Sequence, residues 1–93
     1  MKLSVLDQSP IRSGSNAAEA IEETVRLAQA ADRLGYTRYW LAEHHASTAL
    51  AGSAPEIVIT RVAGATQRIR VGSGGVMLAH YSPLKVAETF KVL

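Results

Sequence analysis

Cysteine is absent from this 93-residue chain, and aromatic side chains make up only 5% of it. Without cysteine, the chain has neither a disulfide framework nor a thiolate metal site. With so few aromatic residues, a buried core has to be built from valine, isoleucine, leucine and alanine. The apolar fraction of 47% is ordinary for a globular protein, and the length predicts at most one small domain.

The sequence also lacks a strong charge of either sign and any long hydrophobic run. The formal net charge is +2, and the ten lysine and arginine residues are scattered. A nucleic-acid-binding surface would need them clustered, so we expect no nucleic-acid partner. No apolar run reaches the length of a membrane span, and the N-terminus lacks the apolar core and cleavage site of a signal peptide. We therefore expect a cytoplasmic protein that does not associate with membranes.

Strand-like and helix-like segments alternate along the chain. Strands are expected at residues 3–6, 38–42 and 69–78, and helices at residues 17–34, 55–66 and 83–93. Helical crossovers with short connections imply parallel strands. Parallel sheets are normally covered on both faces, but helices of this kind cover only one. We therefore expect an N-terminal piece of a larger α/β domain, or a domain that other chains complete.

The helix ends carry recognisable signals. The pairs Asn16 with Glu19 and Ser53 with Glu56 have the spacing of capping boxes. Ser82 is the expected N-cap of the third helix, with Pro83 as its first residue. An apolar stripe from Ile21 to Leu34 predicts that the first helix lies on an apolar surface. The second helix is apolar almost all round, which indicates deep burial or a partner subunit.

Glu43, His44 and His45 follow the second strand directly. Active sites of parallel α/β sheets and barrels lie at this end of the strands. Because strand side chains alternate, we expect His45 on the face of Glu43, and His44 on the other face with Trp40. We expect Trp40 itself in the core. The three ionisable groups therefore do not converge on one metal ion, and one histidine is a candidate acid, base or hydrogen-bond donor.

Two alternatives for this strand end stay open. The first is a solvated loop with surface histidines. The second is a metal-dependent hydrolase, whose ligands would be Asp7, Glu43, His45 and His80. Asp7-Gln8-Ser9 and His80-Tyr81 follow the first and third strands, so in a parallel sheet both segments lie on the same rim as His44. For Asp7 and Ser9 themselves we expect an ordinary loop.

The segment Gly72-Ser73-Gly74-Gly75 interrupts the third strand. It is not the dinucleotide-binding fingerprint, because apolar residues up to Leu78 follow it in place of a helix. Glycine inside a strand marks either a bulge or a close approach of the backbone to a ligand. One interpretation is a flat surface that supports a planar ring, and the other is a packing feature.

With these motifs the chain resembles the bacterial luciferase-like flavin monooxygenases over its whole length. The residues that carry the resemblance lie in four segments: 27–35, 41–45, 69–78 and 82–84. The resemblance implies a (β/α)8 TIM barrel, of which this chain is the N-terminal βαβαβα part. It also implies reduced FMN as cofactor, with the deazaflavin F420 as the alternative, and O2 and a small organic substrate such as an aldehyde.

The resemblance further implies roles for particular residues. His44 would be the catalytic residue, and Ser73, Gly74 and Gly75 would contact the flavin, with a non-proline cis peptide at the glycine pair. Helices 55–66 and 83–93 would form a homodimer interface, and a separate flavin reductase would supply the reduced cofactor. The flavin phosphate would be held by residues beyond Leu93. The isolated chain would then be a non-catalytic fragment or an association module.

Overall fold

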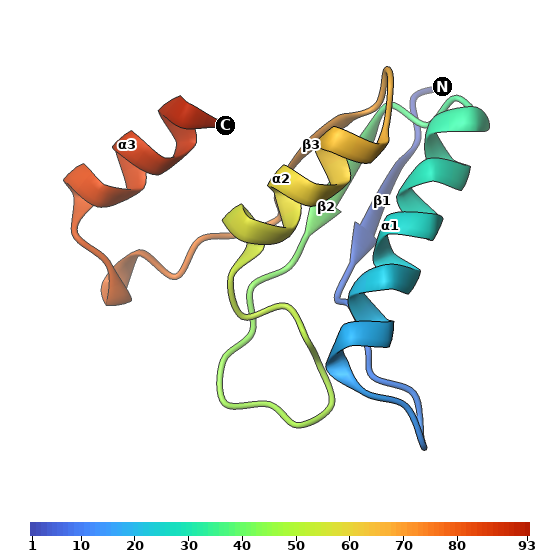
Figure 1. The fold of residues 1–93 in the computed structure, drawn as a ribbon. Helices are drawn as coiled ribbons and strands as arrows, with labels where there is room; N and C mark the ends of the chain where they lie inside the picture. Colours follow the sequence, from blue (N-terminus) through green and yellow to red (C-terminus); the bar gives the residue numbers. More distant parts are fainter.

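The computed structural model describes residues 1–93, and its strands and helices alternate as the sequence predicts (Figure 1). The strands are β1 (Ser4–Asp7), β2 (Arg38–Leu41) and β3 (Arg70–Ser73). The helices are α1 (Ala17–Arg33), α2 (Pro55–Ala65) and α3 (Pro83–Val92), with a short 3-10 turn, η1 (Leu78–His80), before α3.

The strands form one parallel sheet in the order β1-β2-β3. In its register, Leu6 lies beside Trp40 and Trp40 beside Gly72, while Leu41 lies between Asp7 and Ser73. The predicted parallel arrangement is confirmed. Because the strands run the same way, the residues that follow each of them meet at one edge of the sheet.

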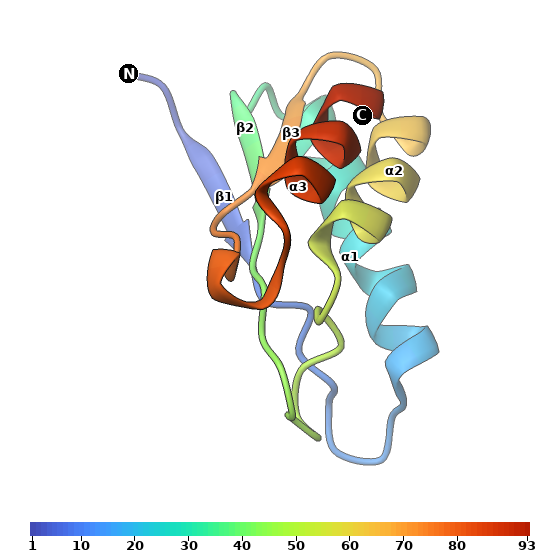
Figure 2. The same cartoon turned by 90° about the vertical axis from the view of Figure 1, so that its left-hand side faces the viewer.

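Helices α1 and α2 cover one face of the sheet (Figure 2). The buried core consists of nine side chains: Val25, Ala28, Ala31, Tyr39, Leu41, Val58, Ile59, Val62 and Ile69. Most are aliphatic, as the composition requires. Each large aliphatic side chain that becomes fully buried contributes about 1.5–3 kcal/mol, so this layer holds the strand ends in place.

The opposite face of the sheet is uncovered. Leu6 is 62% exposed and Trp40 is 36% exposed on this face, so the expectation that Trp40 lies in the core was wrong. A Cβ atom at Gly72 would lie 3.0 Å from the Trp40 ring. Glycine at this position therefore lets the indole lie across the neighbouring strand.

The start of α1 is as predicted, but the start of α2 is not. The Asn16 side chain accepts a hydrogen bond from the Glu19 backbone N–H at 2.9 Å. Helix α2 is preceded by Ala54, and no side chain caps it. The predicted Ser53 cap was wrong because Pro55 opens the helix and leaves Ser53 one residue too early. Leu34 was also misplaced, since it follows the last turn of α1 and is 77% exposed.

The third strand is shorter than predicted. It ends at Ser73, and the last bond in line with the sheet runs from the Gly74 N–H to the Leu41 carbonyl at 2.7 Å. Beyond it the Ser73 hydroxyl bonds to the Gly75 backbone and turns the chain. Residues 74–78 therefore leave the sheet and cross toward the end of β2.

Helix α3 starts as predicted but buries none of its residues. The Ser82 hydroxyl accepts from the Lys85 N–H at 3.5 Å, and Pro83 is the first helical residue. Figure 1 shows α3 set apart from the strands. Its apolar residues Leu84 and Val92 are exposed, so this helix presents apolar surface outward. None of the helices combines the length and apolar character that crossing a bilayer requires.

Candidate functional site

Three segments meet at the C-terminal edge of the sheet. They are the residues after β1, the loop 42–54 after β2, and the segment 74–82 after β3. Backbone bonds tie the first two together: the Ala51 N–H donates to the Ser9 carbonyl at 2.9 Å, and the Ile11 N–H to the Ala49 carbonyl at 2.8 Å. The loop after β2 is therefore anchored along its length.

His44 is held by its backbone at the centre of this edge. Its N–H donates to the Gly52 carbonyl at 2.9 Å. A Cβ at Gly52 would lie 3.2 Å from the Ala42 carbonyl oxygen, so glycine permits this close passage. The His44 ring is half-buried, and its Nε2 lies 3.5 Å from the amide nitrogen of Gln8. Gln8 was expected on the same rim as His44 because it follows a strand of the same sheet, but the contact between the two side chains was not predicted.

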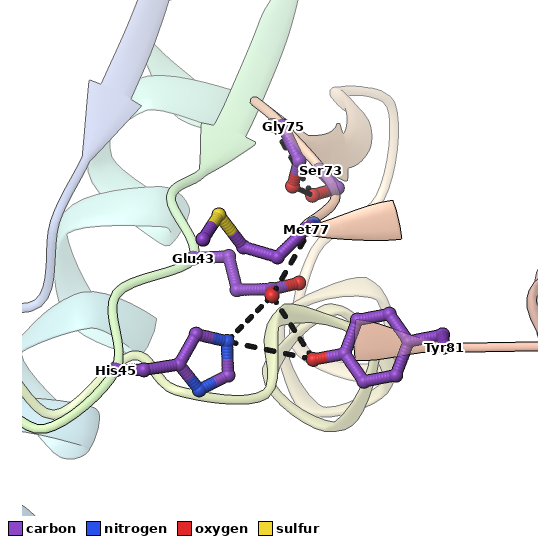
Figure 3. Close-up of polar contacts among 6 residues, drawn as sticks. All are labelled: Glu43, His45, Ser73, Gly75, Met77 and Tyr81. Carbon is purple, nitrogen blue, oxygen red and sulfur yellow. Dashed lines mark hydrogen bonds and ion pairs between the residues drawn. The ribbon is translucent and has the colours of Figure 1, made fainter. Parts of the chain in front are cut away.

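A second group of residues surrounds Glu43, and we call it the Glu43 cluster: Glu43, His45, Tyr81 and the Met77 N–H (Figure 3). The Glu43 Oε2 atom accepts from His45 Nε2 at 2.6 Å, from the Tyr81 hydroxyl at 2.9 Å and from Met77 at 3.3 Å. The Glu43 side chain is 2% exposed. Its other oxygen, Oε1, is buried without a partner.

The electrostatics of the Glu43 cluster favour a charged carboxylate. Burial raises the pKa of Glu43, but the hydrogen bonds from His45, Tyr81 and Met77 outweigh it and leave the pKa below its ordinary value. Burial and the neighbouring Glu43 carboxylate raise the pKa of Tyr81. At neutral pH the cluster therefore contains an ionised acceptor and a protonated tyrosine donor.

The predicted faces of the two histidines are confirmed in part. His45 bonds directly to Glu43, whereas the ring of His44 contacts Gln8. Tyr81 was expected on this rim, but its bond to Glu43 was not predicted because 38 residues separate the two. Tyr81 follows β3 just as His45 follows β2, and this shared position after a strand places both side chains at the same edge of the sheet.

The geometry does not assemble the alternative metal site. Asp7 is buried and accepts from the Tyr39 hydroxyl at 2.6 Å and from the Ser9 N–H at 2.7 Å. The expectation of an ordinary loop for Asp7 and Ser9 was therefore wrong. His80 lies with its ring edge toward His45, with centroids 5.3 Å apart. No group of three or more His, Asp or Glu side chains is close enough to hold a metal ion.

The glycine-rich segment has a backbone exposed on one side. A Cβ at Gly75 would meet nothing within 4 Å, whereas a Cβ at Gly74 would lie 2.9 Å from the end of Leu6. The Ser73 hydroxyl is used by the Gly75 backbone. All peptide bonds are trans, so the expected cis peptide at the glycine pair is not present.

With the fold and this edge described, comparison with known proteins decides the family. The model of the family "Luciferase-like monooxygenase" matches residues 1–93. The chain belongs to the luciferase-like monooxygenase family. Its βαβαβα arrangement is that of the N-terminal part of a (β/α)8 barrel.

Individual members agree with this assignment. The chain is 53% identical over 93 residues to the N-acetyl-S-alkylcysteine monooxygenase of Bacillus subtilis, covering all of this chain and 28% of that protein. The crystal structure of apo-MsnO8 matches with a TM-score of 0.96 at 55% identity, covering 98% of this chain and 28% of that one. The chain thus spans 28% of the length of each of these two proteins.

A third comparison shows the fold alone. The oxygenating constituent of 3,6-diketocamphane monooxygenase from Pseudomonas putida, solved in complex with FMN, matches with a TM-score of 0.87 at 24% identity. The match covers 96% of this chain and 24% of that one.

Proposed function

We propose that residues 1–93 form the first part of a flavin-dependent monooxygenase that uses reduced FMN and O2 to oxidise a small organic substrate such as an aldehyde. The observation that carries this proposal is the convergence of His44, the Glu43 cluster and the exposed glycine backbone at one edge of a parallel sheet. Membership of a monooxygenase family supports it. The FMN complex of a protein with the same fold supports the choice of cofactor.

The residues at this edge of the sheet could contact one face of the planar flavin ring. The Gly75 backbone is open, and Leu6 supports the neighbouring Gly74 from the uncovered face. The buried Oε1 of Glu43 has no partner and is an acceptor for a hydrogen-bond donor. Ser73, Gly74 and Gly75 would hold the flavin ring, and other parts of the protein would bind its phosphate. When bound, reduced flavin supplies the electrons that activate O2.

His44 is proposed as the catalytic residue because it combines a fixed backbone with a ring that remains accessible. The hydrogen bond from its backbone N–H to the Gly52 carbonyl fixes the backbone from which the side chain extends, and His44 is half-buried. An imidazole can hold or release a proton near neutral pH. In this role His44 would donate a hydrogen bond or proton to an oxygen atom at the edge of the sheet.

Isotope labelling of the product tests the proposed reaction. The complete protein containing these residues would be supplied with chemically reduced FMN, 18O2 and a panel of aldehydes and thioethers. A monooxygenase transfers one atom of O2 to the substrate and the other to water, so the product should gain one 18O atom. Product without label would contradict the proposal. Substrate turnover coupled to hydride transfer with F420, without label from 18O2, would favour the deazaflavin alternative.

Three further proposals concern the source of reduced flavin, the cellular location and the oligomeric state. A separate reductase would supply the reduced flavin, and the protein would act in the cytoplasm. Helices 55–66 and 83–93 would form a homodimer, supported by the 69% exposure of both Ile57 and Leu84. Light scattering of the complete protein with Ile57→Glu would show a monomer where the unmodified protein shows a dimer.

A further inference from the structure

The two adjacent histidines face partners of opposite hydrogen-bonding character. His45 Nε2 lies 2.6 Å from a carboxylate oxygen of Glu43, and a carboxylate only accepts. His44 Nε2 lies 3.5 Å from the amide nitrogen of Gln8, and an amide NH2 only donates. A neutral imidazole carries one proton on one of its two ring nitrogens, and its partners decide which.

We propose that His44 and His45 are held in opposite tautomers, with the proton on Nδ1 of His44 and on Nε2 of His45. Gln8 and Glu43 are then positioning residues for the two rings. The tautomers themselves follow from the contacts in this chain. The roles that the two rings would have in catalysis rest on the proposed function.

On the His45 side, the Glu43 cluster leaves little freedom. Glu43 Oε2 also accepts from the Tyr81 hydroxyl at 2.9 Å, so the tyrosine proton is already used. The Tyr81 oxygen lies 3.5 Å from His45 Nε2. With the Glu43 carboxylate ionised and buried, the proton on His45 has to sit on Nε2 to satisfy the 2.6 Å contact.

On the His44 side, the backbone beside Gln8 is held in a strained conformation. Ser9 has φ +49°, a left-handed value that is uncommon for a residue other than glycine. Three contacts stabilise it: its N–H donates to Asp7, its hydroxyl lies 2.8 Å from the Thr24 hydroxyl, and its carbonyl accepts from Ala51. Strain held so firmly is typical of functional sites, and here it fixes the backbone next to Gln8.

The backbone is therefore held on both sides of the Gln8–His44 contact, at Ser9 and at His44, whose N–H donates to Gly52. The 3.5 Å separation is long for a hydrogen bond. Contacts of this kind are often long in the absence of ligand and shorten when the site is filled.

Opposite tautomers divide the chemistry between the histidines. His44 would present an N–H donor at Nδ1, suited to stabilising negative charge on an oxygen atom. His45 would present a lone pair at Nδ1, and Figure 3 shows this second ring nitrogen pointing away from Glu43. A histidine oriented by a carboxylate in this way is suited to accept a proton.

Nitrogen NMR of the complete protein without flavin tests the tautomers directly. Histidine would be labelled with 15N, and signals assigned with His44→Gln and His45→Gln. Spectra would be recorded at about pH 8.5, where an imidazole of ordinary pKa is neutral. We expect a protonated Nδ1 for His44 and a protonated Nε2 for His45. Protonated Nε2 on His44, or equal mixtures at both residues, would overturn the inference.

Variants of the exposed Gln8 sharpen the test. Gln8→Glu replaces the donor with an acceptor of nearly the same shape, so the proton on His44 should move to Nε2 while His45 is unchanged. Gln8→Leu should leave His44 as a mixture of tautomers. Tyr81→Phe is the control, and it should leave the tautomers of both histidines as they are. A His44 spectrum that does not respond to Gln8→Glu would exclude Gln8 as its positioning residue.

The NMR readout is independent of the proposed function, because it involves neither flavin nor turnover. If the histidines have the expected tautomers but the product carries no 18O, only the proposed monooxygenase function is rejected. Labelled product with the wrong tautomers would reject this inference alone.

Discussion

His45 Nε2 lies 2.6 Å from Oε2 of Glu43, two positions earlier in the loop that leaves β2. The same oxygen accepts from Tyr81, which lies 38 residues further along the chain. The contact thus connects the ends of β2 and β3. The glycine-rich segment forms the end of β3 and is followed by Met77 and Tyr81, which both bond to Glu43. The Glu43 cluster therefore helps to hold the support proposed for the flavin.

Acid should weaken this connection. The pKa of Glu43 is lower in the folded protein than in the unfolded chain, so the stability it contributes is present above the unfolded pKa of about 4.3. That stability is lost as the pH falls through the lower, folded pKa. Tyr81→Phe removes one donor from the carboxylate and raises the folded pKa, so the acid-unfolding midpoint should move to higher pH. Circular dichroism against pH measures this midpoint.

The control for this prediction is Tyr36→Phe, at a half-buried tyrosine that packs against the core. It should leave the acid midpoint unchanged. Equal shifts in Tyr81→Phe and Tyr36→Phe would mean that the hydrogen bond to Glu43 is not responsible.

Asp32 should be important for the stability of the fold. Its carboxylate accepts from the backbone N–H groups of Gln67, Arg68 and Ile69 at 2.7, 3.1 and 2.9 Å, and so connects the end of α1 to the start of β3. The hydrogen bond from Gln67 and those from the next two residues lower the pKa of Asp32 despite its burial. Asp32→Asn should reduce the free energy of unfolding by about 1–3 kcal/mol.

Urea unfolding of the complete protein measures the effect of Asp32→Asn, with Glu88→Gln at an exposed position of α3 as the control for loss of a carboxylate. The loss should be greatest at neutral pH and vanish in acid, because the Asp32 contribution disappears as the pH falls through its lowered pKa. A loss that persists unchanged in acid would contradict the assignment to the charged carboxylate.

Gly72 should control the position of Trp40. A Cβ at this position would lie 3.0 and 3.3 Å from two atoms of the indole ring, so Gly72→Ala should displace the ring. Trp40 is the one tryptophan of these 93 residues, and comparison with Trp40→Phe isolates its fluorescence. The emission of Trp40 should shift in Gly72→Ala and stay unchanged in Gly64→Ala, where a Cβ meets nothing within 4 Å. An unshifted spectrum in Gly72→Ala would mean that the ring does not rest on the strand.

Much of the fold could be predicted because its signals are local. The cap at Asn16 and the Ser82-Pro83 helix start depend on neighbouring residues, and both are confirmed. The parallel sheet follows from the alternation of strands and helices. The location of the site at the C-terminal edge then follows from the parallel sheet.

The remaining features depend on contacts between distant residues. The end of β3 is set by the Ser73 turn and by the bond from Met77 to Glu43, neither of which a run of apolar residues reveals. Gln8 and Tyr81 were expected at this edge, but their partners could not be predicted because they lie 36 and 38 residues away. The alternation of side chains along β2 does not say which face the helices cover, so Trp40 was placed in the core.

Turnover of the His44→Ala variant tests the central claim most directly. The complete protein, with reduced FMN, O2 and its best substrate, would be compared with His44→Ala and with Thr48→Ala, an exposed residue of the same loop. We expect turnover to fall by about 10²–10⁴-fold in His44→Ala, with FMN affinity unchanged, and to be unaffected in Thr48→Ala. Undiminished turnover in His44→Ala at unchanged FMN affinity would contradict the account.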